Sequence, residues 1–187
     1  MSLKPLVAVA TLALDALPGP RPPATPVIAE AVASASEEAT CTGEWATLDF
    51  CTPVWSGPPE KLVVAEVAVG WFESGFQERI QAGRCRKYEC DAKYGPGGVF
   101  LGHRARSYWQ LQKTSFVAPF WDDMVGSDPM PTFEAARGAA RVLGAGYKRC
   151  HSLGGAVSWY ATHDCSAADK RAAYAELLFK KTHSSGQ

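Results

Sequence analysis

The residue best suited to acid–base chemistry in this chain is a single Glu in an aromatic setting. Glu73 lies in the segment WFESGF (residues 71–76), at the end of an apolar stretch. Burial beside apolar rings disfavours the charged form of a carboxyl group and raises its pKa. A carboxyl group that keeps its proton near neutral pH can act as a general acid. The plain alternative is a solvated Glu at a helix end.

The element that must position Glu73 is a helix. Pro59 suits the first turn of a helix, where the missing N–H costs nothing. Apolar residues then recur at helical spacing from Glu60 to about Glu73. Gly75 follows and is expected to end the helix. The carboxyl group of Glu73 would therefore lie at the C-terminal end of a buried helix.

The remaining elements are also predicted to be mostly helical. Residues 79–104 contain the cluster GPGG and are expected to form a long loop with at most a short hairpin. Thr132 is a candidate N-cap, and Gly144 and Gly146 are candidate stops, for the helix between them. The expected helices beyond the loop cover residues 107–116, 133–143, 153–162 and 167–181.

Six cysteines form three pairs of near neighbours: Cys41 with Cys51, Cys85 with Cys90, and Cys150 with Cys165. An even number in this arrangement is typical of a disulfide-bonded protein from an oxidising compartment. We expect these three pairs to form, because short loops bring their ends together most often. The alternatives are reduced, buried cysteines or a zinc site, although no C-x-x-C occurs and the His residues lack paired ligand spacings.

The first 40 residues differ in composition from the rest. Lys4 precedes an apolar run, Leu6–Leu14, as in a secretory signal, although Asp15 interrupts the pattern. Residues 18–40 are rich in Pro, Ala and Thr, which predicts a linker. We therefore expect a signal-like segment and linker over residues 1–40 and one folded domain over residues 41–187.

Overall composition excludes some classes of protein. The chain has 187 residues, of which 47% are hydrophobic and 20% charged, as in an ordinary globular domain. Its 19 basic and 19 acidic residues cancel, which argues against a nucleic-acid partner bound through a broad basic surface. The run Leu6–Leu14 is about half the length of a membrane span, so no integral span is expected.

Four segments, taken in order, resemble the lytic transglycosylase family. ESGF (73–76) is similar to the catalytic Glu-Ser-Gly-Phe signature of that family, and ARSYWQL (105–111) to its Gly-Leu-Met-Gln segment. GAARVL (138–143) is similar to the helix that follows, and AVSWYA (156–161) to the Ala-Ala-Tyr-Asn segment. The resemblance implies a mainly α, lysozyme-like fold, with five to seven helices around a substrate cleft and a small β element or none.

The resemblance also implies a peptidoglycan-cleaving enzyme. Glu73 would protonate the glycosidic oxygen between N-acetylmuramic acid (MurNAc) and N-acetylglucosamine (GlcNAc). As a carboxylate, it would then take a proton from the sugar's own 6-hydroxyl, which closes a 1,6-anhydro ring. Gln110 would bind the substrate near the cleaved bond, and Tyr160 would hold the Glu73 carboxyl. The other substrate-binding candidates are Ser74, Ser107 and Tyr108, and no cofactor or metal is implied.

Departures from the family pattern leave alternatives open. Ser107 stands where the family usually has Gly, and Ala161 where it usually has Asn. A catalytically inactive, glycan-binding or structural protein of the same fold is therefore one alternative. A hydrolytic lysozyme, or endolysin, is another; it needs a second carboxylate, for which the sequence candidates are Asp91, Asp122 and Asp123.

A cysteine peptidase is a further alternative, because Asp164-Cys165-Ser166 resembles a motif of papain-like cell-wall peptidases. A thiol nucleophile needs a His, and the only later one is His183 in a polar tail. We therefore expect Cys165 to be a disulfide partner. The expected partner of the chain is a peptidoglycan glycan strand, in the periplasm or outside the cell. A phage virion or lysis protein fits as well, with the virion or envelope partner left open.

Overall fold

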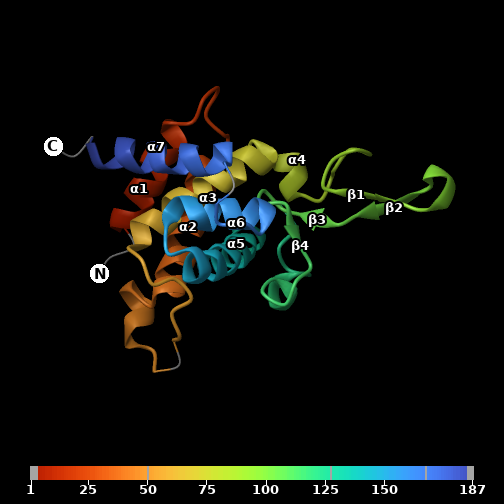
Figure 1. Cartoon of the computed structure of the whole chain (residues 1–187). Helices are drawn as coiled ribbons and strands as arrows, with labels where there is room; N and C mark the ends of the chain where they lie inside the picture. The colour runs from red at the N-terminus through yellow and green to blue at the C-terminus, as the bar shows by residue number, and fades with distance from the viewer. Residues whose placement is uncertain (1–3, 50, 127, 167, 185–187) are drawn as a thin grey trace.

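The computed structural model describes residues 4–49, 51–126, 128–166 and 168–184. These residues form seven α-helices and two small antiparallel sheets (Figure 1). The mainly α architecture with a small β element is therefore confirmed. The helices are α1 (Lys4–Asp15), α2 (Thr25–Thr40), α3 (Pro59–Ser74), α4 (Glu78–Gln81), α5 (Pro129–Cys150), α6 (Leu153–Thr162) and α7 (Lys170–Ser184). The strands are β1 (Ala92–Tyr94), β2 (Phe100–His103), β3 (Ala105–Arg106) and β4 (Leu111–Gln112). Short 3-10 turns cover Gly43–Thr47, Pro96–Gly98 and Ala118–Phe120.

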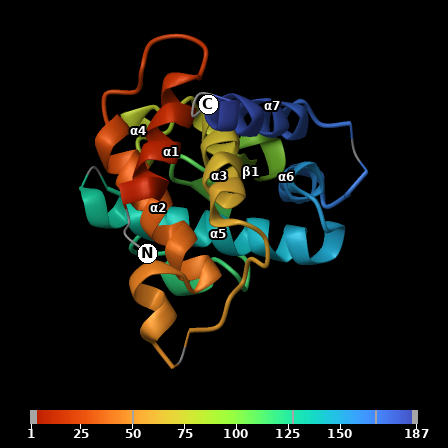
Figure 2. The same ribbon diagram turned by 90° about the vertical axis from the view of Figure 1, so that its left-hand side faces the viewer.

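Helix α3 runs through the middle of the helical body, where it contacts α1, α2, α5, α6 and α7 (Figure 2). Every residue from Leu62 to Gly70 is buried. A helix that is apolar on all sides is stable only in the interior of a protein. It begins at Pro59 and ends before Gly75, whose φ is +58°, as the sequence predicts.

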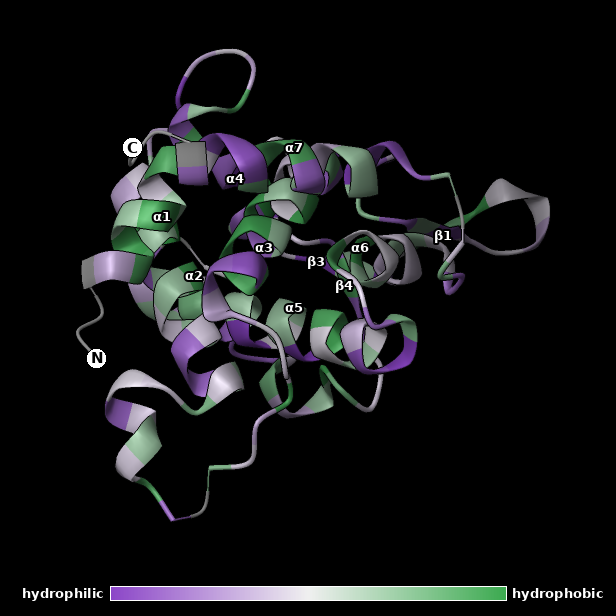
Figure 3. Cartoon of the chain, turned by 60° about the vertical axis from the view of Figure 1, so that its left-hand side comes forward, coloured by the Kyte–Doolittle hydropathy of each residue, from purple (hydrophilic) through white to green (hydrophobic). Residues whose placement is uncertain are grey.

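Residues 18–40, which the sequence predicts to be a linker, consist largely of helix α2 (Thr25–Thr40) in this structure, and the signal-like character of residues 1–17 stays a prediction. Helices α1 and α2 pack against each other and against α3, and Ile28, Ala29 and Val32 are fully buried in the core. Figure 3 shows the apolar colouring of α1. The linker prediction was wrong because Ala, which is common in this segment, is the strongest helix former, and its small side chain lets helices pack closely. Pro26 lies in the first turn of α2, where Pro is tolerated.

Three predicted helix bounds in the C-terminal half were also wrong. Helix α5 runs through Gly144 and Gly146 instead of ending there. A Cβ at Gly144 would lie 2.5 Å from the carbonyl oxygen of Val54, so this glycine permits close packing. The α5 N-cap is Asp128 rather than Thr132. Helix α6 has the expected bounds, and α7 begins at Lys170 rather than at residue 167, which lies outside the described residues.

The two sheets form a small region beside the helices. Strand β1 pairs with β2, and β3 pairs with β4, both antiparallel. The β1–β2 hairpin projects away from the helical body (Figure 1). Residues 107–116, predicted to be a helix, instead form the turn between β3 and β4, strand β4 itself and the chain just after it. Ser107 and Gln110 in that turn both have positive φ values, +67° and +49°. A helix cannot include such residues.

All six cysteines are paired as predicted: Cys41–Cys51, Cys85–Cys90 and Cys150–Cys165. The first bond ties the end of α2 to the segment before α3, the second closes the loop that precedes β1, and the third ties the end of α5 to the segment after α6. Cys165 therefore carries no thiol, which removes the cysteine-peptidase alternative. No group of metal-binding side chains is found among the described residues, and none of their helices is long and apolar enough to cross a membrane.

Candidate active site

Glu73 lies in the last turn of α3, and 21% of its side chain is exposed. Burial raises the pKa of its carboxyl group above the ordinary value of 4.5. The positive charge of Arg171 lowers this pKa and the negative charge of Asp169 raises it, and the effect of burial is the largest of the three. Glu73 is therefore a partly accessible carboxyl group that binds its proton more tightly than a solvated Glu.

The partner of Glu73 comes from α7. The Nε atom of Arg171 lies 3.2 Å from Oε1 of Glu73. Asp169 holds this Arg in place, because its carboxylate accepts hydrogen bonds from the Arg171 backbone N–H (2.7 Å) and from Nη1 (3.1 Å). Sequence reasoning missed both residues, since they belong to no motif. The available signal was an Asp at the start of a predicted helix.

Tyr160, on α6, lies close enough to Glu73 for the negative charge of the Glu73 carboxylate to affect the pKa of the Tyr160 hydroxyl. Burial raises the pKa of Tyr160 well above 10.0, and the negative charges of Glu73 and Glu66 add to the effect. Its hydroxyl donates a hydrogen bond to the carbonyl oxygen of Trp109 at 2.6 Å. Tyr160 thus fixes the β3–β4 turn directly, and its expected hold on the Glu73 carboxyl stays a prediction.

The β3–β4 turn contains Ser107, Tyr108 and Gln110. The Gln110 side-chain amide donates to the carbonyl oxygen of Ser107 (3.0 Å) and contacts Cys90 Sγ (3.5 Å). Tyr108 is buried against Phe76, with ring centroids 5.4 Å apart, and burial raises its pKa to about 12. Tyr108 is a core residue and Gln110 is half-buried, so the expected contact of Gln110 with a substrate stays a prediction.

Ser107 is fully buried, and its hydroxyl has no hydrogen-bond partner among the described residues. Its φ of +67° lies in the left-handed region, which favours glycine. A Gly at this position would adopt the same backbone conformation without strain. Ser107 is therefore a strained residue of the turn, and its buried hydroxyl has no visible route to a substrate.

Replacing Ser107 by Gly is expected to stabilise the protein by about 1 kcal/mol. The change relieves the left-handed strain and removes an unsatisfied buried hydroxyl, and the added backbone freedom of Gly offsets part of the gain. Chemical denaturation measures the difference. Ser74→Ala is the matched control and is expected to cost about 1 kcal/mol, because that buried hydroxyl is fully used. A loss of stability in Ser107→Gly would contradict the argument.

Ser74 acts at the end of α3. Its hydroxyl donates to the carbonyl oxygen of Gly70 and accepts from the backbone N–H of Phe76, both at 3.1 Å. These bonds turn the chain after Glu73 and direct Phe76 into the core. Ser74 is 5% exposed. Its position therefore supports the turn after Glu73 rather than contact with a substrate.

The four family-like segments converge around Trp109. The indole N–H of Trp109 donates to the carbonyl oxygen of Glu66 on α3 (2.9 Å), and its ring packs on Phe76 with centroids 6.1 Å apart. Tyr160 binds its carbonyl oxygen. A Cβ at Gly138 of α5 would lie 2.9 Å from Leu111 Cδ1, so α5 packs closely on the same turn. The four segments thus contact one another in the folded chain, and Glu73 belongs to the first of them.

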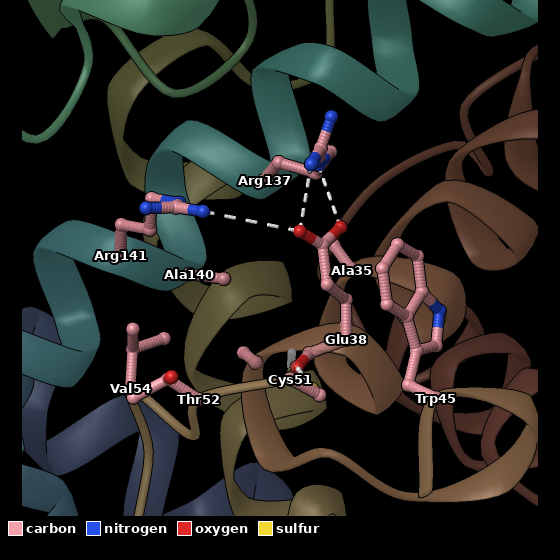
Figure 4. A pocket seen from close by; sticks show the side chains of 10 residues that line it. Ala35, Glu38, Trp45, Cys51, Thr52, Val54, Arg137, Ala140 and Arg141 are labelled. Atoms are coloured by element: carbon pink, nitrogen blue, oxygen red, sulfur yellow. Dashed lines mark hydrogen bonds and ion pairs between the residues drawn. The ribbon is translucent and has the colours of Figure 1, made fainter. Parts of the chain in front are cut away.

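One pocket, of about 460 Å³, lies between α2 and α5 (Figure 4), and two others have volumes of about 200 and 350 Å³. In the first pocket, Arg137 Nη2 donates to Glu38 Oε1 at 2.7 Å, and Arg141 lies 3.9 Å from the same carboxylate. Glu38 thus neutralises only one of these two guanidinium groups, and Glu134, which does not line the pocket, lies 3.0 Å from Arg137 Nη1. Glu73 lines none of these three pockets, so a substrate cleft at Glu73 stays a prediction.

The acidic residues proposed as a second carboxylate are all exposed. Asp91 accepts a hydrogen bond from Gln112 Nε2 at 2.7 Å, and Asp122 lies 3.8 Å from Arg106. Neither these two nor Asp123 is among the groups that affect the pKa of Glu73. The carboxylate that does affect it is Asp169.

Comparison of the chain with protein families, curated proteins and solved structures finds no match. The resemblance to lytic transglycosylases therefore stays a prediction from the four short sequence segments.

Proposed function

We propose that this chain is a lysozyme-like enzyme that cleaves the β-1,4 bond between MurNAc and GlcNAc in peptidoglycan, as a lytic transglycosylase. One observation carries the proposal: a partly accessible Glu with a raised pKa ends a buried helix, beside the cluster built from the family-like segments. A carboxyl group of this kind is the acid that glycosidic cleavage needs.

The proposed reaction uses Glu73 twice. In the first step Glu73 gives its proton to the glycosidic oxygen, the bond to the MurNAc anomeric carbon breaks, and the sugar gains oxocarbenium character. In the second step the Glu73 carboxylate takes the proton of the MurNAc 6-hydroxyl, whose oxygen bonds to the anomeric carbon. The products are a 1,6-anhydro end and a free GlcNAc hydroxyl, and Glu73 has its proton back without the addition of water.

Arg171 suits the intermediate state of this cycle. After the first step Glu73 is negatively charged, and a guanidinium group 3.2 Å away stabilises that charge. Asp169 offsets part of the positive charge, and with burial it keeps the pKa of Glu73 above its ordinary value. The pair Arg171–Asp169 thus lets one carboxyl group serve as acid and then as base. Gln110 is the residue proposed to bind the glycan near the cleaved bond.

The three disulfides support a location outside the cytoplasm, where disulfides persist. Peptidoglycan is found in that location in bacteria. Both a bacterial envelope enzyme and a phage protein that opens the wall agree with this placement. In either case the proposed partner is the glycan strand itself.

A hydrolytic lysozyme is the second candidate, because the structure brings Asp169 close enough to Glu73 to affect its pKa. A second carboxylate near the acid is a requirement of the hydrolytic mechanisms. Asp169 is already bound by Arg171, however, and such a carboxylate is a poor base or nucleophile. We therefore rank hydrolysis below the transglycosylase reaction.

The test is product analysis of purified peptidoglycan sacculi digested with the protein. The expected products are muropeptides with 1,6-anhydro ends, each lighter by one water than the corresponding reducing-end product in mass spectrometry. Reducing ends would instead identify a lysozyme. Sacculi that bind the protein but release no fragments would identify a glycan-binding protein without turnover and would overturn the proposal.

A further inference from the structure

The β1–β2 hairpin carries an exposed apolar tip, residues 94–102, which follows Glu73 in the sequence by 21 residues or more. Residues 94–102 read YGPGGVFLG and include no charged side chain. Val99 is 60% exposed and Leu101 57% exposed, with Phe100 between them at 40%. Exposed apolar groups this close together mark a surface that meets another molecule. Figure 1 shows that the hairpin extends away from the helices, so neighbouring elements do not cover its tip.

The tip continues into a row of aromatic side chains. Tyr88 stacks near Tyr94 with ring centroids 6.3 Å apart, and Tyr94 meets Phe100 across the strand pair at 5.8 Å. Phe100 in turn lies 5.0 Å from the ring of His103. Tyr88 is 80% exposed. Aromatic residues next to an apolar tip are typical of side chains at the boundary between water and lipid.

Basic residues surround this aromatic row. Residues 84–106 include six Lys or Arg and two acidic residues, so their formal net charge is +4 in a chain whose total is zero. One of the two acids, Glu89, is bound by Arg79, which lowers its pKa to about 2. Lys87 and Lys93 are exposed beside Tyr88 and Tyr94. This segment therefore complements a negatively charged surface.

The base of the hairpin is fixed to the rest of the chain. The Cys85–Cys90 disulfide closes the preceding loop, and Glu89 joins it to α4 through Arg79. His103 Nδ1 lies 2.8 Å from the Glu89 carbonyl oxygen. These contacts fix the position of the hairpin, and its tip is exposed without any rearrangement.

The chemistry of the tip favours a lipid surface over a glycan. A sugar site pairs aromatic rings with polar side chains that bond the sugar hydroxyls. The only polar side chain in residues 94–102 is Tyr94, whose hydroxyl already donates to the carbonyl oxygen of Lys87 at 2.8 Å. We therefore propose that the tip of the β1–β2 hairpin inserts into the surface of a bilayer that contains anionic lipid. Its apolar side chains enter the acyl boundary, and Lys87 and Lys93 lie against the head groups.

Vesicle co-sedimentation tests this inference on the full chain. One set of vesicles is phosphatidylcholine alone, and the other contains about 30% phosphatidylglycerol. We expect the chain to bind the anionic vesicles and not the neutral ones, with binding that weakens as salt is added. Equal binding to both sets, or binding to neither, would overturn the inference.

Matched variants identify the segment responsible. Val99→Ser/Leu101→Ser is expected to weaken binding to anionic vesicles roughly tenfold or more, because it removes the buried apolar groups. Lys87→Gln/Lys93→Gln is expected to weaken it by a similar factor. The controls are Met130→Ser/Leu177→Ser and Lys148→Gln/Arg149→Gln, which make the same kinds of change at exposed positions elsewhere.

Thermal unfolding of each variant checks that it is folded. We expect all of them to fold, because all the substituted side chains are exposed. Tip variants that bind as well as their controls would contradict the inference. So would hairpin-dependent binding to purified sacculi in the absence of vesicle binding, which would assign the tip to the glycan instead. Glu73→Gln is expected to leave vesicle binding unchanged, so this result is independent of the proposed enzymatic activity.

Discussion

Glu73→Gln is expected to reduce lysis of peptidoglycan by roughly 10²–10⁴-fold, because the amide cannot donate a proton to the glycosidic oxygen or accept one from the 6-hydroxyl. The side chain keeps its size. The loss of its ion pair with Arg171 is expected to cost at most about 1 kcal/mol of stability, since Glu73 is partly exposed. The measurement is the fall in turbidity of a suspension of purified sacculi.

Glu78→Gln is the matched control for this substitution. Glu78 lies five residues further along, in α4, and is exposed. It is expected to keep activity within about twofold of the parent, as is usual for a surface change. Glycan binding by Glu73→Gln, measured by co-sedimentation with sacculi, is expected to persist. A Glu73→Gln protein that lyses sacculi as fast as the parent would show that Glu73 is not the acid.

A second large effect is expected from Glu66, which lies two turns before Glu73 on α3. Its side chain is fully buried, and Oε2 accepts a hydrogen bond from Ser36 at 2.9 Å. Oε1 is buried with no partner among the described residues. Burial raises the pKa of Glu66 well above 4.5, and the Ser36 bond lowers it by less. The folded protein therefore holds this proton more tightly than the unfolded chain does.

The sign of the resulting pH dependence follows from proton binding. Below about pH 4.5 Glu66 is protonated in both states and has no effect. Above that pH only the folded state keeps the proton, so the free energy of unfolding falls by about 1.4 kcal/mol for each pH unit. The fall continues until the pH passes the raised pKa of the folded state. Raising the pH above about 4.5 thus destabilises the protein through this one group.

Glu66→Gln is expected to flatten this dependence, because the amide does not titrate. Denaturant unfolding of parent and variant near pH 5 and near pH 8 measures the change. The variant is expected to be the more stable protein at the higher pH. Glu73→Gln serves as the comparison, since Glu73 has a raised pKa of the same sign but is partly exposed. Equal slopes for parent and Glu66→Gln would contradict the assignment.

The parts of the fold that the sequence predicted are those with local signals. Pro59 and Gly75 mark the ends of α3, and α6 has the predicted bounds, Leu153–Thr162. The disulfides join cysteines 5, 10 and 15 residues apart, so short loops were a sufficient guide. The N-terminal helices were missed because Ala in a core and Ala in a linker have the same local pattern.

The environment of Glu73 also has one part that the sequence predicted and one part that it did not. Its place at the end of an apolar helix was predictable from the residues next to it. Its partner Arg171 was not, because the two residues are brought together only by the packing of α7 on α3. The left-handed turn at Ser107 was mistaken for a helix, since neither Ser107 nor Gln110 is a residue type that normally signals a positive φ.

The Cys150–Cys165 bond has a consequence for survival among proteases. It closes a covalent ring that contains the whole of α6, including Tyr160. A single cut anywhere in this ring would leave both fragments attached, so that α6 would keep its place against α5 and α7. A protein that works among secreted proteolytic enzymes would in this way tolerate a nick that an open chain would not.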